Sequence, residues 1–110
     1  MYRVIEMNYF APKTLDEMFK FLSGNDDSVI FAGGTDIMPK LNYYKIRPKN
    51  IIFIGNLGLD YIKLEEDKIK IGATTKLSDL MKSDVISDKV PILKQVIHLM
   101  GSMAIRNAGT

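Results

Sequence analysis

The sequence of 110 residues contains no cysteine, and this absence excludes several kinds of site. Disulfide bonds, thiolate-bound zinc and iron–sulfur clusters held by the chain itself all need cysteine. His98 is the only histidine, and one imidazole cannot form a metal site alone. The sequence therefore predicts that the chain holds no metal ion of its own.

Long apolar runs and an excess of one charge are also missing. No apolar run approaches the ~18 residues that a membrane-spanning helix needs. The first residues lack the order of charged and then apolar residues found in a signal peptide. The 15 basic and 13 acidic residues leave a net charge of only +2, which does not indicate binding to nucleic acid or to an anionic membrane. We therefore expect a cytoplasmic protein with no membrane span and no nucleic-acid partner.

The residues that are present have the balance of a globular domain. Apolar residues make up 46% and charged residues 25%, and the length suits one small domain. Short β-prone runs alternate with short amphipathic helices, which predicts an α/β fold. The chain ends in loop-like sequence at Gly109-Thr110, so we expect it to be one part of a longer polypeptide.

Two uninterrupted apolar runs predict the centre of the fold. Residues 28–32 and 50–54 read as strands covered on both faces, as in a parallel sheet. A helix lies between them, and it has to begin near Thr35 because Pro39 is tolerated only in a first turn. The segment from Val29 to Ile54 is therefore predicted to form a βαβ unit.

Further elements are predicted on both sides of this unit. Residues 9–11 read as a short strand. A helix beginning at Thr14 follows, where Thr14 and Glu17 have the spacing of a capping box. The apolar residues expected on one face of this helix are Leu15, Met18, Phe19 and Leu22.

The second half of the chain predicts a hairpin and two helices. Residues 61–65 and 68–71 alternate apolar and polar side chains around Glu66-Asp67, which is typical of a half-exposed hairpin. A short helix is expected over 77–81 and a last helix from Pro91 to Gly101. Residues 102–110 are expected to be irregular.

The strongest local signal is a glycine turn that follows the first apolar run. Its residues are Val29, Ile30, Phe31, Ala32, Gly33, Gly34, Thr35, Asp36 and Ile37. Backbone N–H groups in such a turn can surround an anion, and glycines let an oxygen-rich ligand approach closely. A tight turn without a ligand is an equally good interpretation. The pattern is neither a Walker loop nor a G-x-G-x-x-G fingerprint.

Other candidate residues are more simply explained by structure. Asp36 has the chemistry of a general base, but at a helix start it is more often a cap, as Thr35 is. The segment Gly72-Ala73-Thr74-Thr75 is either a second ligand wall or a helix cap, and the cap is favoured. His98 is expected at the surface, and no catalytic triad can be assembled.

Four stretches, taken in order, resemble a known family. They are Ala-Gly-Gly-Thr-Asp from Ala32, a strand ending Ile-Phe-Ile at Ile54, Ile-Gly-Ala-x-Thr from Ile71, and Gly-Ser-x-x-Ile-Arg-Asn-x-Gly-Thr from Gly101. This order is similar to the start of the FAD-binding domain of molybdenum hydroxylases, the group that includes xanthine dehydrogenase and carbon monoxide dehydrogenase. The resemblance extends from about Tyr9 to Thr110.

The resemblance implies a fold and a cofactor. Residues 1–110 would form the first, small α/β subdomain of a two-part domain related to the vanillyl-alcohol-oxidase type, with the second subdomain absent. The loop from Val29 to Ile37 would hold the FAD pyrophosphate. Met100 and Gly101 would line the flavin site, with Gly109 and Thr110 at a second loop.

The resemblance also implies partners. Molybdopterin and 2Fe–2S clusters would lie in partner subunits, and electrons would pass from those clusters through FAD to an acceptor. Because much of the family's flavin domain is absent, we expect weak or no FAD binding by this chain alone, and exposed apolar surface would favour self-association. A non-catalytic interaction domain and a nucleotide-phosphate-binding α/β domain without flavin remain as alternatives.

Overall fold

The computed structural model describes residues 7–43 and 45–110. The chain divides into two compact units, Met1–Leu57 and Gly58–Thr110. Within the described residues, no helix is both long enough and apolar enough to cross a membrane.

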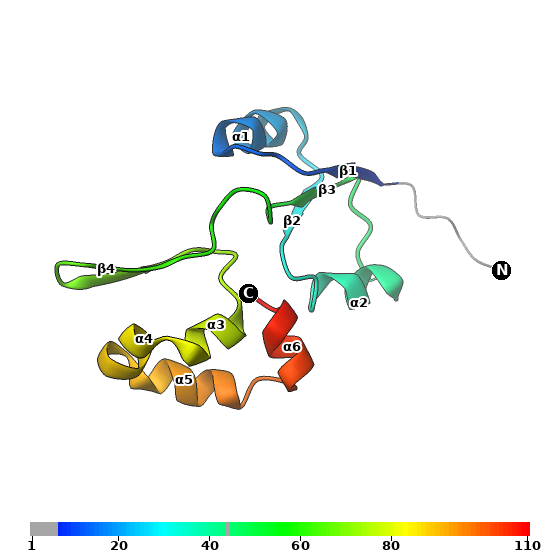
Figure 1. Ribbon diagram of the computed structural model, residues 1–110. Helices are drawn as coiled ribbons and strands as arrows, with labels where there is room; N and C mark the ends of the chain where they lie inside the picture. Colours follow the sequence, from blue (N-terminus) through cyan, green and yellow to red (C-terminus); the bar gives the residue numbers. More distant parts are fainter. Residues whose placement is uncertain (1–6, 44) are drawn as a thin grey trace. The chain divides into compact units, whose positions relative to one another are not determined.

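The first unit is built on a parallel sheet of three strands (Figure 1). Strand β3 (Asn50–Phe53) lies between β1 (Asn8–Phe10) and β2 (Ser28–Phe31), and both neighbours run parallel to it. Parallel neighbours need crossover connections, which α1 (Leu15–Gly24) and α2 (Ile37–Asn42) provide. The predicted βαβ unit is confirmed, although α2 ends well before Pro48.

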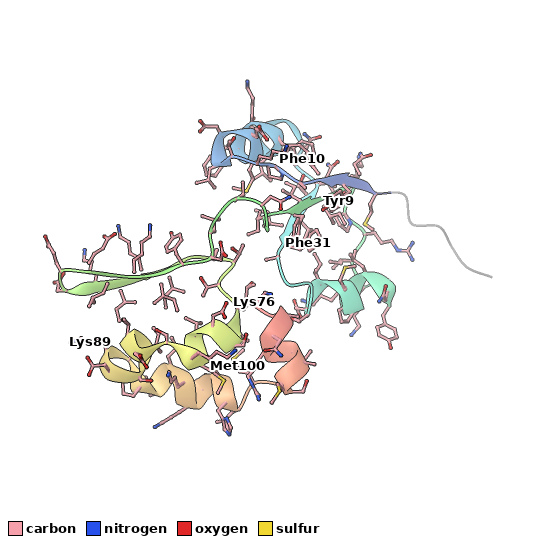
Figure 2. All side chains as sticks on the ribbon, in the orientation of Figure 1. Tyr9, Phe10, Phe31, Lys76, Lys89 and Met100 are labelled. Atoms are coloured by element: carbon pink, nitrogen blue, oxygen red, sulfur yellow. The ribbon has the colours of Figure 1, made fainter. Side chains whose placement is uncertain are left out.

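The two helices of this unit lie on opposite sides of the sheet (Figure 1). On the α1 side, Met18 packs with Ile52 and Ile54, and the ring of Phe10 stacks on Phe21 with centroids 4.6 Å apart. Tyr9 lies on the other face, where its ring centroid is 6.4 Å from that of Phe31 (Figure 2). Both faces of the sheet therefore carry aromatic side chains.

Helix α1 begins where the capping pattern predicts. The Thr14 hydroxyl accepts a hydrogen bond from the Glu17 N–H at 3.1 Å, and the Glu17 carboxylate accepts one from the Lys13 N–H at 3.1 Å. The predicted apolar face is partly wrong, because Leu15 and Phe19 are 42% and 57% exposed. The helix turns Met18 and its neighbours Phe21 and Leu22 to the sheet instead.

The second unit contains an antiparallel hairpin and four short helices (Figure 1). The strands β4 (Ile62–Glu65) and β5 (Lys68–Ile71) confirm the predicted hairpin. The helices are α3 (Leu77–Lys82), α4 (Asp84–Lys89), α5 (Pro91–His98) and α6 (Met103–Ala108). Leu80, Ile86 and Ile97 form the core of this unit.

Two of these helices correct the sequence-based expectation. Helix α4 replaces a simple break at Ser83-Asp84, and its N-cap is the Ser83 hydroxyl, which accepts from the Ile86 N–H at 3.3 Å. Helix α6 occupies most of the tail for which the sequence predicts an irregular course. Its cap is the Ser102 hydroxyl, which accepts from the Ile105 N–H at 3.3 Å. Each helix has a serine cap but is too short to show an apolar period.

Candidate functional site

The glycine loop, defined here as Ala32 to Asp36, joins β2 to α2. Gly34 has a φ of +77°, and a Cβ atom there would lie 3.0 Å from Cγ of Met38. The Met38 N–H donates to the Gly34 carbonyl at 3.1 Å. Helical hydrogen bonding therefore starts at Gly34, in a conformation that favours glycine.

The predicted caps of α2 are wrong. Asp36 makes no capping hydrogen bond, and its carboxylate accepts from Nζ of Lys40 at 2.8 Å on the surface. The N-cap position of α2 falls on Asp36, whose backbone is already in the helical region, with φ −102° and ψ −46°. A side chain that caps a helix normally stands on an extended backbone, so the Asp36 carboxylate does not reach the N–H groups of the first turn, and Thr35 lies one residue before this position.

This geometry leaves a group of backbone donors open. Within the described residues, the N–H groups of Gly33, Gly34, Thr35 and Asp36 donate no hydrogen bond to the protein. Successive free N–H groups in a turn form a concave site for an anion such as a phosphate. The loop supplies hydrogen-bond donors rather than an acid, a base or a nucleophile.

The residues on both sides of the loop hold it in place. Val29, Ile30 and Phe31 belong to β2, and the Phe31 ring packs at 5.2 Å from that of Phe53 in β3. Ile37 is buried at the start of α2. These predicted site residues therefore anchor the two ends of the loop.

The other predicted site residues lie in the second unit, at the two ends of α6. Met100 and Gly101 precede this helix, and Gly101 has a φ of +56°. Gly109 follows it and is buried. Its N–H donates to the Ile105 carbonyl at 2.7 Å, and its carbonyl accepts from the Leu77 N–H at 2.9 Å. Thr110 is exposed.

The segment from Gly72 to Thr75 has a structural role that differs from the predicted cap. A Cβ atom on Gly72 would lie 1.8 Å from the Leu59 carbonyl oxygen, so only glycine fits. The buried Thr75 hydroxyl donates to the Tyr61 carbonyl and accepts from the Tyr61 N–H, both at 3.1 Å. The N-cap of α3 is Lys76, without a side-chain cap bond.

A polar hollow of about 330 Å³ lies beside this segment in the second unit. Its lining residues are Asp60, Thr74, Lys76, Ser78, Asp79 and Asn107. Within the described part of the chain, no group of three or more histidine, cysteine or carboxylate side chains could hold a metal ion. His98 is exposed, as expected.

Comparison with known proteins connects the loop and the tail to one family. Residues 5–110 match the family model for the FAD-binding domain in molybdopterin dehydrogenase. The chain is 35% identical over 106 residues to the glyceraldehyde dehydrogenase medium chain of Sulfolobus acidocaldarius, covering 96% of this chain and 38% of that one. It is 36% identical over 108 residues to the nicotinate dehydrogenase FAD-subunit of Eubacterium barkeri, covering 96% and 36%.

Solved structures agree with this relationship. The carbon monoxide dehydrogenase of Hydrogenophaga pseudoflava matches 100% of this chain and 39% of its own, with a TM-score of 0.92 and 28% identity. Quinoline 2-oxidoreductase from Pseudomonas putida 86 matches 99% and 39%, with a TM-score of 0.92 and 26% identity. The chain thus spans less than two-fifths of the length of these relatives. It belongs to the family of FAD-binding domains of molybdopterin dehydrogenases.

Proposed function

We propose that this chain forms part of the FAD site of a molybdenum-hydroxylase-type dehydrogenase. In that assembly, electrons would pass from iron–sulfur clusters through FAD to an acceptor. FAD, when bound, supplies the redox chemistry, and this chain supplies binding and orientation. The observation that carries the proposal is the set of open N–H donors at Gly33, Gly34, Thr35 and Asp36.

The proposed role of the glycine loop is to bind the FAD pyrophosphate. Hydrogen bonds from backbone N–H groups to a charged phosphate are stronger than those between neutral groups. A glycine at position 34 keeps the turn in the form that leaves these groups free. Val29, Ile30, Phe31 and Ile37 position the loop from the strand and the helix that flank it.

The proposed role of the tail is to line the flavin. Met100 and Gly101 lie before α6, and Gly109 and Thr110 lie after it. The fixed length of this helix therefore sets the spacing of the two pairs. We propose that a second subdomain, which the longer relatives have room for, completes the site.

The proposed partners are an iron–sulfur subunit and a molybdopterin subunit. This proposal rests on relatives whose names describe medium chains and FAD-subunits of dehydrogenases. A cytoplasmic location belongs to the same proposal.

A titration followed by NMR tests the assignment of the loop. The chain, labelled with ¹⁵N, is titrated separately with FAD, ADP and riboflavin. We expect FAD and ADP to shift the amide signals of Gly33 to Asp36, and riboflavin to leave them unchanged. Shifts at Met100 and Gly101 are expected with FAD only.

The other outcomes separate the alternatives. If ADP and FAD shift the same loop signals and both leave the amide signals of Met100 and Gly101 unchanged, a nucleotide-phosphate-binding domain without flavin is favoured. If no ligand shifts the loop signals at millimolar concentration, the pyrophosphate assignment is wrong for this chain.

A further inference from the structure

The turn between α5 and α6 is held by one side chain. Helix α5 ends with the Leu99 and Met100 N–H groups bonded back to the carbonyls of Val96 and Ile97 at 3.1 and 2.9 Å. The chain then reverses at Gly101, where φ is +56°. The carbonyls of Met100 and Gly101 lie beyond the helical bonds and need other partners.

Arg106 provides that partner. Its Nη1 donates to the Gly101 carbonyl at 3.2 Å and to the Met100 carbonyl at 3.4 Å. Its own backbone N–H donates to the Ser102 carbonyl at 3.0 Å, which fixes the base of the side chain in α6. The guanidinium therefore joins α6 to the segment that precedes it.

The charge of Arg106 suits the end of α5 better than the start of α6. A cation near the carbonyls that end a helix is stabilising, whereas a cation near a helix N-terminus is not. Arg106 itself lies in the last turn of the short helix α6, and its guanidinium reaches back to the two carbonyls that precede the helix. An apolar side chain at position 106 cannot supply these hydrogen bonds.

Burial of apolar side chains contributes little to holding this turn. A Cβ atom on Gly101 would lie 2.9 Å from Cγ2 of Ile105, so the backbone passes close to α6. Met100 is 44% exposed and Met103 is 71% exposed, so apolar burial does not hold this turn. The Arg106 bridge therefore acts together with the Ser102 cap to hold the shape of this turn.

We infer that Arg106 is a positioning residue that holds the Met100–Gly101 turn in the shape that receives the flavin. This inference rests on the proposed function, because it is that function which places the turn beside FAD. Arg106 acts through the turn, so its guanidinium needs no contact with the cofactor.

Two variants and one control test the inference on the whole chain. Arg106→Met removes the charge and the donors, and Arg106→Lys keeps the charge on a side chain that is one atom shorter than the path to Nη1, so that its ammonium falls short of the two carbonyls. Lys82→Met removes a charge from α3 without touching the turn. Lys82 makes no ion pair within the described residues.

The first measurement needs no cofactor. The ¹³C carbonyl signals of Met100 and Gly101 report hydrogen bonds accepted by these groups. We expect both signals to move in Arg106→Met and in Arg106→Lys, and to stay in place in Lys82→Met. Unchanged carbonyl signals in Arg106→Met would overturn the role of Arg106, whatever FAD does.

The second measurement is the dissociation constant for FAD from the NMR titration. Loss of the bridge is expected to weaken binding about three- to tenfold in both Arg106 variants, the net effect of about one ordinary hydrogen bond. Lys82→Met is expected to bind as the unsubstituted chain does. Equal weakening in Lys82→Met and Arg106→Met would show that only overall charge matters, and would overturn the inference.

If the proposed function is wrong, the two NMR measurements give a different combination of results. In that case the unsubstituted chain gives no response to FAD at Met100 or Gly101, while the carbonyl signals still depend on Arg106. The cofactor part of the inference would then be wrong together with the proposed function.

Discussion

Gly34 carries two separate constraints, and a substitution there tests both. Its φ of +77° disfavours any residue with a Cβ, and Met38 stands in the space that the Cβ needs. We expect Gly34→Ala to lower the free energy of unfolding by about 1–2 kcal/mol, the cost of a left-handed backbone for an L-residue. We also expect weaker FAD binding. Urea denaturation and a FAD titration measure the two effects.

Gly58→Ala is the matched control. Gly58 has a φ of +67°, and a Cβ atom there would meet no other atom within 4 Å, so it shares the backbone cost without the loop. It should lose similar stability and keep its affinity for FAD. Equal loss of FAD binding in both variants would count against the loop as the pyrophosphate site.

Glu66 is the opposite case, because replacing it with glycine should stabilise the protein. It lies in the turn of the hairpin with a φ of +48°. Glu66→Gly should raise the free energy of unfolding by about 1 kcal/mol, because glycine adopts this conformation without steric cost. Urea denaturation measures the change. Asp67→Gly, at the neighbouring position without a positive φ, should give no gain, and equal gains in both variants would refute the explanation.

Among the elements, the segment that leads into α3 depends on the buried Thr75 hydroxyl. Thr75→Val keeps the shape but leaves the Tyr61 N–H without its partner, whereas the Tyr61 carbonyl still accepts from the Gly72 N–H at 2.9 Å. We expect the free energy of unfolding to fall by about 1–3 kcal/mol, the cost of a buried unsatisfied group. Thr75→Ser keeps the hydroxyl and should recover most of the loss. A fully stable valine variant would show that solvent satisfies the Tyr61 backbone.

The sequence predicts elements well where an apolar pattern is long enough. The strands and α1 are predictable because their apolar runs and the Thr14 cap are local signals. Helices α4 and α6 are not, because α4 has only two apolar side chains, and no residue of α6 is buried, so that neither helix shows a buried apolar face in the sequence. Helix α6 depends on contacts distant in sequence, such as the bond between the Leu77 N–H and the Gly109 carbonyl.

The candidate site, like the fold, can be predicted only in part from the sequence. The Gly33-Gly34 turn can be predicted from the sequence, because a glycine pair directly after a strand is typical of a tight turn. The failure of Thr35 and Asp36 to cap α2 cannot be predicted, since it depends on the backbone conformation at the N-cap residue. The Arg106 bridge cannot be predicted from the sequence either, because a side-chain contact across a turn leaves no periodic pattern.

For the whole molecule, we predict weak FAD binding by the isolated chain. The loop supplies a few hydrogen bonds, and ordering a large cofactor against part of a site offsets much of their effect. The chain spans only 36% to 39% of the relatives compared above. Flavin fluorescence during titration measures the affinity, and a sub-micromolar dissociation constant would contradict this prediction.

We also predict that copies of this chain associate with one another. Ile92 and Val96 in α5 and Leu99 at its C-cap are 65%, 50% and 85% exposed and follow one another at helical spacing. We expect sedimentation velocity to show species larger than a monomer as the concentration rises, and Val96→Ser to reduce them. Tyr43→Ser, at a site 77% exposed in the first unit, is the control. A monomer at every concentration would contradict the prediction.

The position of β3 has a consequence for how the chain is made. This strand is the last of its sheet in sequence but lies at the centre, and its residues pair with β1 at Asn8 and with β2 at Ser28. Neither outer strand has a partner until β3 has been synthesised. A nascent chain that stops before Asn50 therefore exposes two unpaired strands, and the ribosome has to deliver β3 before the first unit can fold.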